Sequence, residues 1–410
     1  MGNQTSAPAS PVDASPQSAR TDEESAHTPG GGICASSTSA METLSQWFTP
    51  PTSATASASS SPKDRKTPTN STNTHVRDDG ASQDAEIAAA VTVNRRVEHF
   101  YDVSTQNLGR GHYAVVCRGK CRRTGQLVAI KKIKRFLTDE KRLRAEIAVL
   151  RRVQKHPNIV ELIDVFETAR EVHLVLELCT GGELFERLAD KGPYSEADCV
   201  RHIRDMACAV QYLHEQGIVH RDLKPENILL STPNDDEAVI KVADFGLAKI
   251  FTGTNMKTKC GTWGYSAPEM ISGSGITFGY DYKVDSWSLG TILYILLCGF
   301  HPFDPNGTYS DHEMIACIKN CRYDFKDEVW DTISDGARDL IGHLLVLDPD
   351  QRYSMAELLR HPWITGELVA VSALPLSPTI HRDLARYRQQ EKQKAFSFEM
   401  FDDDDDNQND

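Results

Sequence analysis

The stretch His220-Arg221-Asp222-Leu223-Lys224-Pro225-Glu226-Asn227 decides how the rest of this chain is interpreted. Asp222 can orient a hydroxyl group and accept its proton, and Lys224 can neutralise nearby negative charge. Asn227 and Asp244, the latter in a later Asp-Phe-Gly triplet, offer the hard oxygen ligands that Mg²⁺ prefers. Each motif alone is also compatible with a turn or a cap. Together and in this order they indicate phosphoryl transfer, in which positioning and charge neutralisation dominate.

Residues upstream of this stretch add the features needed to hold phosphates. Leu108 begins a segment in which Gly109 and Gly111 would let backbone N–H groups approach an anion, although a tight turn has the same pattern. Lys131 ends an apolar strand, where a solvated edge charge is the ordinary alternative. Glu146 follows on a predicted helix and is the expected partner of Lys131, because a Lys–Glu pair of this kind positions the α- and β-phosphates of a nucleotide.

Composition excludes several classes of protein. The chain has 410 residues and a net charge of −13, which argues against a general nucleic-acid role. Its 10 cysteines include no CxxC pair, so we expect free thiols in an intracellular protein. No apolar run is long enough to cross a membrane, and the N-terminus lacks the pattern of a signal peptide.

The chain divides into three regions. Residues 1–98 are rich in Ser, Thr, Pro and Ala and are expected to be disordered. Residues 101–364 form the folded part, with a small β-rich lobe over about 101–178 and a larger, mainly helical lobe over about 182–364. Residues 365–410 form a tail that ends in consecutive aspartates. The expected fold class is α+β, bilobal, with disordered tails and one candidate helix in the C-terminal tail.

The span from about Tyr101 to Ile364 resembles the eukaryotic protein kinase domain throughout its length. The residues that carry the resemblance are Gly109, Gly111, Lys131, Glu146, His220–Asn227, Asp244–Gly246, Ala267–Glu269, Asp285–Gly290 and Arg352. The resemblance implies transfer of the γ-phosphate of ATP to protein hydroxyls with Mg²⁺. It also implies an ion pair between Glu269 and Arg352, and support of the catalytic loop by Asp285.

The same resemblance implies where the nucleotide lies. The adenine is expected against Val116, Ala129 and Leu229. Backbone groups of Glu177 and Leu178 are the expected hinge contacts. Without the resemblance, apolar residues in these runs would be assigned to the core.

Local features narrow the class. Lys224 and Thr262 match the serine/threonine type rather than the tyrosine type. Gly181–Phe185 and His361–Ile364 are similar to the calcium/calmodulin-dependent kinase group. No loop matches the spacing of an EF-hand, so no fused calcium-binding module is expected.

Control of activity and choice of substrate follow from this likeness. In that group, the acids at Glu183 and Glu226 attract a basic residue upstream of the phosphorylated site, and Thr262 belongs to the substrate-docking region. Glu183 has two other interpretations, as a helix cap or as a contact to the ATP ribose. Arg221 before Asp222 favours activation by a phosphate, and Thr258 is its predicted position, modified by an upstream kinase.

The two tails carry regulatory hypotheses. Ile380, Leu384 and Tyr387 share one helical face among basic residues, as in calmodulin targets and autoinhibitory segments, although a solvated helix has the same pattern. Met1-Gly2-Asn3-Gln4-Thr5-Ser6 fits the N-myristoylation pattern at Gly2. One acyl chain gives only reversible binding, so we expect a cytoplasmic protein, partly associated with membranes.

Two alternatives to an active protein kinase are considered. A pseudokinase scaffold would bind partners without catalysis, but it would be expected to lack Lys131, Asp222, Asn227 or Asp244, and all four are present. A small-molecule kinase of similar fold is disfavoured by the complete Ala267-Pro268-Glu269 and Thr262 region.

Overall fold

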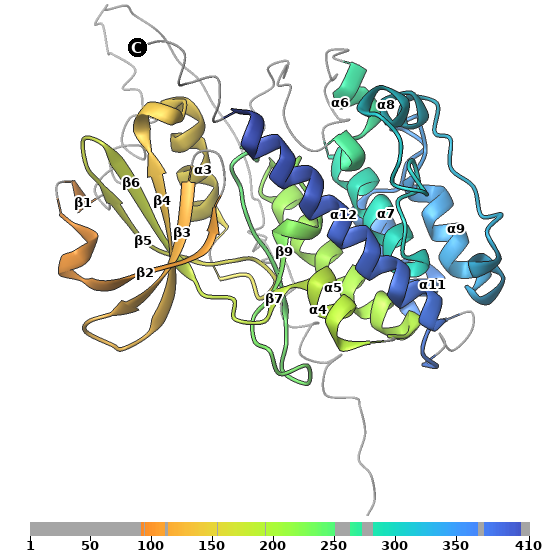
Figure 1. The fold of residues 1–410 in the computed structure, drawn as a ribbon, viewed down its shortest axis with the longest axis horizontal. Helices are drawn as coiled ribbons and strands as arrows, with labels where there is room; N and C mark the ends of the chain where they lie inside the picture. The colour runs from red at the N-terminus through yellow and green to blue at the C-terminus, as the bar shows by residue number, and fades with distance from the viewer. Residues whose placement is uncertain are drawn as a thin grey trace, which may run out of the picture. The chain divides into compact units, whose positions relative to one another are not determined.

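The computed structural model describes residues 92–93, 95–110, 114–153, 155–192, 194–250, 263–272, 282–367 and 373–402. The described part confirms the expected α+β, bilobal architecture, with a sheet followed by a mainly helical region (Figure 1). Within these ranges, no helix combines the length and apolarity that crossing a bilayer requires.

A six-stranded sheet forms the first lobe. In spatial order its strands are β1 (Thr92–Val93), β5 (Leu162–Glu167), β6 (Glu171–Glu177), β4 (Leu127–Lys134), β3 (Ala114–Cys121) and β2 (Tyr101–Arg110). The short β1 pairs in parallel with β5, and the other neighbours are antiparallel. Strand alternation places Val128 and Ile130 of β4 on the same face of the sheet, where both are fully buried in one apolar cluster, and it directs Lys131 to the other face.

The pairing register of the sheet positions the functional lysine. Lys131 of β4 lies opposite Val116 of β3 on one side and opposite Leu174 of β6 on the other. Helix α3 (Glu140–Arg152) follows the 3₁₀ turn η2 (Arg135–Leu137), and Asp139 caps its N-terminus by accepting from the backbone N–H of Lys141 at 3.1 Å. The apolar spacing of α3 buries its inner face, so Glu146 points inward as well.

Helices dominate the second lobe. Their bounds are α4 (Leu184–Lys191), α5 (Glu196–Glu215), α6 (Pro268–Ser272), α7 (Lys283–Cys298), α8 (Asp311–Lys319), α9 (Asp335–Leu344), α10 (Met355–Leu359), α11 (Pro362–Thr365) and α12 (Pro378–Asp402). Helix α7 is apolar on nearly every side and is buried from Val284 to Cys298, as its composition requires.

Short strands and 3₁₀ turns connect the helices. These are β7 (Gly182–Glu183), β8 (Ile218–Val219), η3 (Pro225–Asn227), β9 (Ile228–Leu230), β10 (Ile240–Val242), β11 (Lys249–Ile250), η4 (Trp263–Tyr265) and η5 (Glu328–Thr332). Asp222 and Lys224 lie between two of them, β8 and η3, and Asp244 follows β10. Strands β9 and β10 form an antiparallel hairpin, and the mainly polar residues 231–239 connect them.

The end of the N-terminal region differs from the prediction. Disorder is expected over 1–98, yet Thr92–Val93 form β1 and Val97–His99 form the 3₁₀ helix η1. Val97 is buried in a small cluster with Tyr101 and Phe166, so apolar burial orders this segment. The Ser, Thr and Ala content of residues 1–98 as a whole outweighs the few apolar residues near its end, which is why composition placed the boundary too late.

The C-terminal tail contains the candidate helix. Helix α12 packs against α4 and α7 and runs beside them in Figure 1. Ile380 and Leu384 have no exposed surface, and Tyr387 is 7% exposed, so the predicted apolar face is the packed face. Gly299 ends α7 with a φ of 87°, and a Cβ there would lie 2.6 Å from the carbonyl oxygen of Ile380. The glycine therefore permits the close approach of α12.

Candidate active site

Lys131 is the centre of the site. Its Nζ lies 2.9 Å from Oε1 of Glu146 on α3 and 2.9 Å from Oδ1 of Asp244, so one ammonium group joins the sheet, the helix and the Asp-Phe-Gly segment. Burial alone would lower the pKa of Lys131, but the Coulombic effect of Asp244 and Glu146 outweighs it and the pKa is raised. The side chain therefore stays cationic, as contact with phosphates requires.

The catalytic loop brings Asp222, Lys224 and Asn227 together. Nζ of Lys224 lies 3.1 Å from Oδ2 of Asp222. The Asn227 amide donates to the backbone carbonyl of Asp222 at 2.7 Å and to its Oδ2 at 3.2 Å. Burial raises the pKa of Asp222, and the nearby charges of Lys224 and His220 offset this only in part. The loop thus fixes the orientation of one carboxylate.

Asp285 braces this loop from the buried helix α7. Its Oδ2 accepts from the backbone N–H of His220 at 3.0 Å and lies 2.8 Å from Nε2 of His214. Its Oδ1 accepts from the backbone N–H of Arg221 at 2.8 Å. Arg221 has a φ of 68°, a left-handed conformation that is unfavourable for a side chain of this type. The hydrogen bonds of Asp285 help to offset that cost.

Asp244 is held in an unusual backbone conformation of its own, with a φ of 57°. Its Oδ1 accepts from the backbone N–H of Gly246 at 3.2 Å, and Phe245 beside it is buried against the ring of His220. The positive charge of Lys131 lowers the pKa of Asp244 to about 2, so the carboxylate is ionised.

These oxygen atoms suit a magnesium ion. The Asn227 amide nitrogen is directed at Asp222, which leaves the amide oxygen as the remaining ligand atom of that side chain. Together with the ionised carboxylate of Asp244, this donor set is made only of hard oxygen atoms. Asn227 and Asp244 are therefore the residues that would hold Mg²⁺.

Residues predicted to surround the nucleotide lie on the adjoining strands. Gly109 of β2 lies opposite Val116 of β3, which in turn lies opposite Lys131. Ala129 is buried in β4, and Leu229 of β9 pairs with Glu183 of β7. Register thus places Val116 next to Lys131 and Gly109 one strand further out. Leu108, Val116, Leu178 and Leu229 are partly or largely exposed, whereas a core assignment would bury them.

Glu177, the predicted hinge residue, also has a structural role. Its side chain lies 2.8 Å from Nζ of Lys241, and its backbone N–H donates to the carbonyl oxygen of Glu161 at 2.9 Å. The ion pair joins the end of β6 to β10, and the backbone hydrogen bond joins it to the residue before β5. The prediction concerned its backbone, and the side-chain contact fixes that backbone in place.

Comparison with known proteins agrees with this geometry. Residues 103–364 match the model of the protein kinase domain. The chain belongs to the protein kinase family. The kinase domain also contains the predicted ion pair between Glu269 and Arg352. The fully buried guanidinium of Arg352 donates two hydrogen bonds to the Glu269 carboxylate, at 2.7 and 3.1 Å.

Several relatives of this kinase are calcium/calmodulin-dependent protein kinases by name. It is 45% identical over 315 residues to human calcium/calmodulin-dependent protein kinase type IV, covering 76% of this chain and 60% of the relative. It is 44% identical to human calcium/calmodulin-dependent protein kinase type 1B, covering 66% of this chain and 78% of the relative. A probable myosin light chain kinase of Dictyostelium discoideum is 42% identical, covering 66% and 67% respectively. The chain spans about 60% of the length of the type IV kinase.

Helix α12 contacts Glu183 and Glu226, the two acids predicted to bind a basic residue of the substrate. The guanidinium of Arg388 binds Glu183 through Nη2 and Glu226 through Nη1, the latter at 2.9 Å. Arg388 is 4% exposed. Glu183 occupies the N-cap position of α4, as the capping interpretation requires, but its side chain accepts no capping hydrogen bond. The ribose contact stays a prediction; in the structure the Glu183 carboxylate is engaged by Arg388.

Further contacts of α12 extend this interface. The hydroxyl of Tyr387 bonds to that of Tyr265, which follows the Gly-Thr-Trp-Gly segment. Lys392 pairs with Glu186, and Lys394 lies 3.5 Å from the buried Asp304. Sequence reasoning identified this helix as basic but missed which arginine would be buried. Its position beside Tyr387, on the apolar face, was the available signal.

Some predicted residues lie outside the described ranges. These are Gly111, Thr258, Thr262 and Gly2. The cysteines that the structure describes all have free thiols, as predicted.

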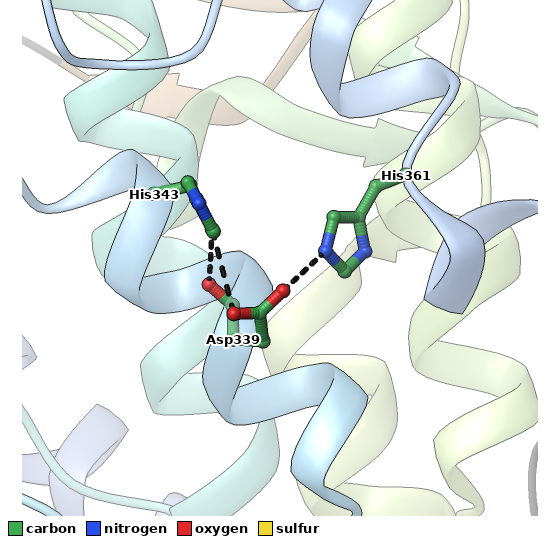
Figure 2. Close-up of side chains that lie close together, drawn as sticks. All are labelled: Asp339, His343 and His361. Carbon is green, nitrogen blue, oxygen red and sulfur yellow. Dashed lines mark hydrogen bonds and ion pairs between the residues drawn. The ribbon is translucent and has the colours of Figure 1, made fainter. Parts of the chain in front are cut away.

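A His–Asp–His cluster in the helical lobe has metal-binding residue types but a hydrogen-bonding role. Asp339, His343 and His361 point toward one another in Figure 2. Nδ1 of His361 accepts from the backbone N–H of Trp363, which leaves the proton on Nε2, 2.9 Å from Asp339 Oδ2. His343 Nδ1 lies 2.9 Å from the carbonyl oxygen of Asp339. Holding an ion would break the cap of α11, so this cluster is a brace between α9 and α11.

Proposed function

We propose that this protein kinase transfers the γ-phosphate of ATP to serine and threonine hydroxyls of proteins. The ammonium group of Lys131, held between Glu146 and Asp244, is the observation that carries the proposal. A cation fixed between two carboxylates is arranged to receive phosphates, and it has no comparable use in a scaffold that only binds partners.

Each residue has one task in the proposed reaction. Lys131 binds the phosphates that are not transferred. Asp222 orients the attacking hydroxyl and accepts its proton, for which its raised pKa makes it a better base than an exposed aspartate. Lys224, whose pKa is raised because Asp222 and Glu226 outweigh its burial, neutralises charge on the moving phosphoryl group. Mg²⁺ held by Asn227 and Asp244 would supply further charge neutralisation.

A peptide-array phosphorylation assay tests this proposal. The full chain should phosphorylate serine and threonine peptides in the presence of Mg²⁺ and ATP. Asp222→Asn should lower the rate by at least about a hundredfold, in line with the loss of a general base. No transfer by either the wild type or Arg388→Ala, in which the contact of α12 with Glu183 and Glu226 is removed, would refute the enzymatic function and favour the pseudokinase scaffold. Equal transfer by the wild type and Asp222→Asn would refute it as well.

The proposed substrates carry a basic residue upstream of the phosphorylated site. The way that Glu183 and Glu226 hold Arg388 supports this, because the same two carboxylates can hold an arginine from a substrate. Burial raises the pKa of Glu183, and the charge of Arg388 opposes that shift. Arrays in which each upstream position is varied should therefore show a preference for arginine.

Helix α12 is proposed to inhibit the kinase by occupying these acids. An arginine on the helix and one on a substrate cannot use the same carboxylates together. We further propose that calcium–calmodulin captures α12 and that phosphorylation of Thr258 by an upstream kinase raises activity. The arrays should show higher rates with calcium–calmodulin, and Thr258→Ala should remove the effect of the upstream kinase.

Membrane association is proposed to be weak and reversible, through a myristoyl group on Gly2. The rest of the protein would then be cytoplasmic. Intact-mass measurement tests this directly. An unmodified or acetylated N-terminus would refute it.

A further inference from the structure

A closed ring of ion pairs ties the beginning of α3 to the sheet. Arg135 of η2 pairs with Glu140 at 2.8 Å and with Glu167 at 2.6 Å. Arg144, one turn along α3, pairs with the same two acids, at 2.9 Å in each case. The ring therefore joins η2, α3 and the last residue of β5. None of its members belongs to the phosphate-transfer residues described above.

Glu167 is the buried member of the ring. Its side chain is 7% exposed, whereas those of Glu140 and Arg144 are each about half exposed. A buried carboxylate must be compensated by charge and hydrogen bonds, and here two guanidinium groups provide both. The η2 turn is also fixed by its backbone, because the N–H of Arg135 donates to the carbonyl oxygen of Arg170 at 3.0 Å. The movable element attached to Glu167 is therefore α3, through Arg144.

Helix geometry relates this anchor to the site. Residues two apart on an α-helix point about 200° apart, so Arg144 and Glu146 lie on opposite sides of α3. Glu146 is directed at Lys131, and Arg144 is directed at Glu167. Rotation or outward displacement of α3 would thus break both contacts together. The hold on Arg144 limits that motion.

We infer that Glu167 is a positioning residue, which keeps Glu146 on Lys131 by holding Arg144 and Arg135. This inference rests on the proposed function, because the Lys131–Glu146 pair matters only if the kinase binds a nucleotide. Loss of the Glu167 charge should loosen α3 and weaken nucleotide binding, while the nucleotide itself never touches Glu167.

Binding of a non-hydrolysable ATP analogue with Mg²⁺, measured by calorimetry on the full chain, tests the inference. Glu167→Gln should weaken binding about fivefold, within the range of couplings measured between residues that act through others. In a Glu146→Gln background the same substitution should have no further effect, because the contact through which it acts is already lost. Glu171→Gln is the matched control, since Glu171 lies on the next strand outside the ring and should bind like the wild type.

The outcomes separate the two proposals. If the wild type fails to bind the analogue, the proposed function is refuted. If the wild type binds and Glu167→Gln binds equally well, the positioning role is refuted. A fivefold loss that persists in the Glu146→Gln background also refutes it, because a general structural defect would add in this way. Should Glu167→Gln not fold, Arg144→Gln breaks the same ring at an exposed position and should weaken binding in the same direction.

Discussion

Arg388→Ala should release the kinase from its own tail. In the structure the Arg388 guanidinium is almost fully buried and bridges Glu183 and Glu226. Breaking a fully buried pair typically costs about 3–5 kcal/mol. The two carboxylates are 27% and 39% exposed, so water can partly replace the arginine, and about 2 kcal/mol is a more suitable value.

That energy sets the size of the effect. Since about 1.4 kcal/mol is a factor of ten, about 2 kcal/mol should shift the balance between bound and released tail about thirtyfold. If the bound tail predominates, the initial rate should rise by up to about this factor. The substitution leaves both acids in place, so a substrate with an upstream arginine can still bind. The assay is the initial rate of phosphorylation of such a peptide, with ATP and Mg²⁺ in excess.

Arg386→Ala is the matched control for this experiment. Arg386 lies on the same helix and carries the same charge, but its side chain is 64% exposed and pairs only locally with Asp383. Its removal should change the rate less than twofold, as is usual for exposed pairs. Equal activation by both substitutions would mean that net charge, not the buried contact, restrains the enzyme. No activation by Arg388→Ala would refute autoinhibition through this residue.

Three further predictions concern pH and buried charges. Burial raises the pKa of Asp222, so kcat of the Arg388→Ala protein should start to fall on acidification at a higher pH than an ordinary aspartate would give; a pH–rate profile whose acid limb lies near pH 4 would contradict this. Asp285→Asn should lower the free energy of unfolding by about 3 kcal/mol in urea, because an amide cannot accept all three hydrogen bonds. Glu269→Gln should also lower the free energy of unfolding by about 3 kcal/mol, because the substitution leaves the fully buried guanidinium of Arg352 without a counter-charge. For either variant, an unchanged midpoint of urea unfolding would show the argument to be wrong.

Local spacing predicted much of the fold and of the site. The pattern of Leu143, Ile147 and Leu150 predicted α3, and the same helix then directed Glu146 at Lys131. The shared face of Ile380 and Leu384 likewise predicted the packed side of α12. Such patterns can be recognised because the side-chain directions of helices and strands repeat every few residues. The spacing of apolar residues therefore predicts which side chains face the core.

Contacts between distant segments were not predictable in the same way. Apart from the i,i+4 pair of Glu140 and Arg144, the ring around Glu167 joins residues that no local period relates. In the sequence, nothing distinguishes the buried carboxylate of Glu167 from other acidic residues in strands. The anchor Val97 was hidden in a polar region for a related reason, since its burial depends on Phe166 in another strand.

The sequence by itself determined the chemistry of this protein: the acid, the lysines and the oxygen ligands in the order of a protein kinase. Only the tertiary structure decided what occupies the acids Glu183 and Glu226. The basic tail contains several arginines and lysines that are equivalent in composition, and the packing of α12 on α4 and α7 selects Arg388 among them. The physical reason is that burial, which makes one ion pair matter more than its neighbours, is a property of the folded chain alone.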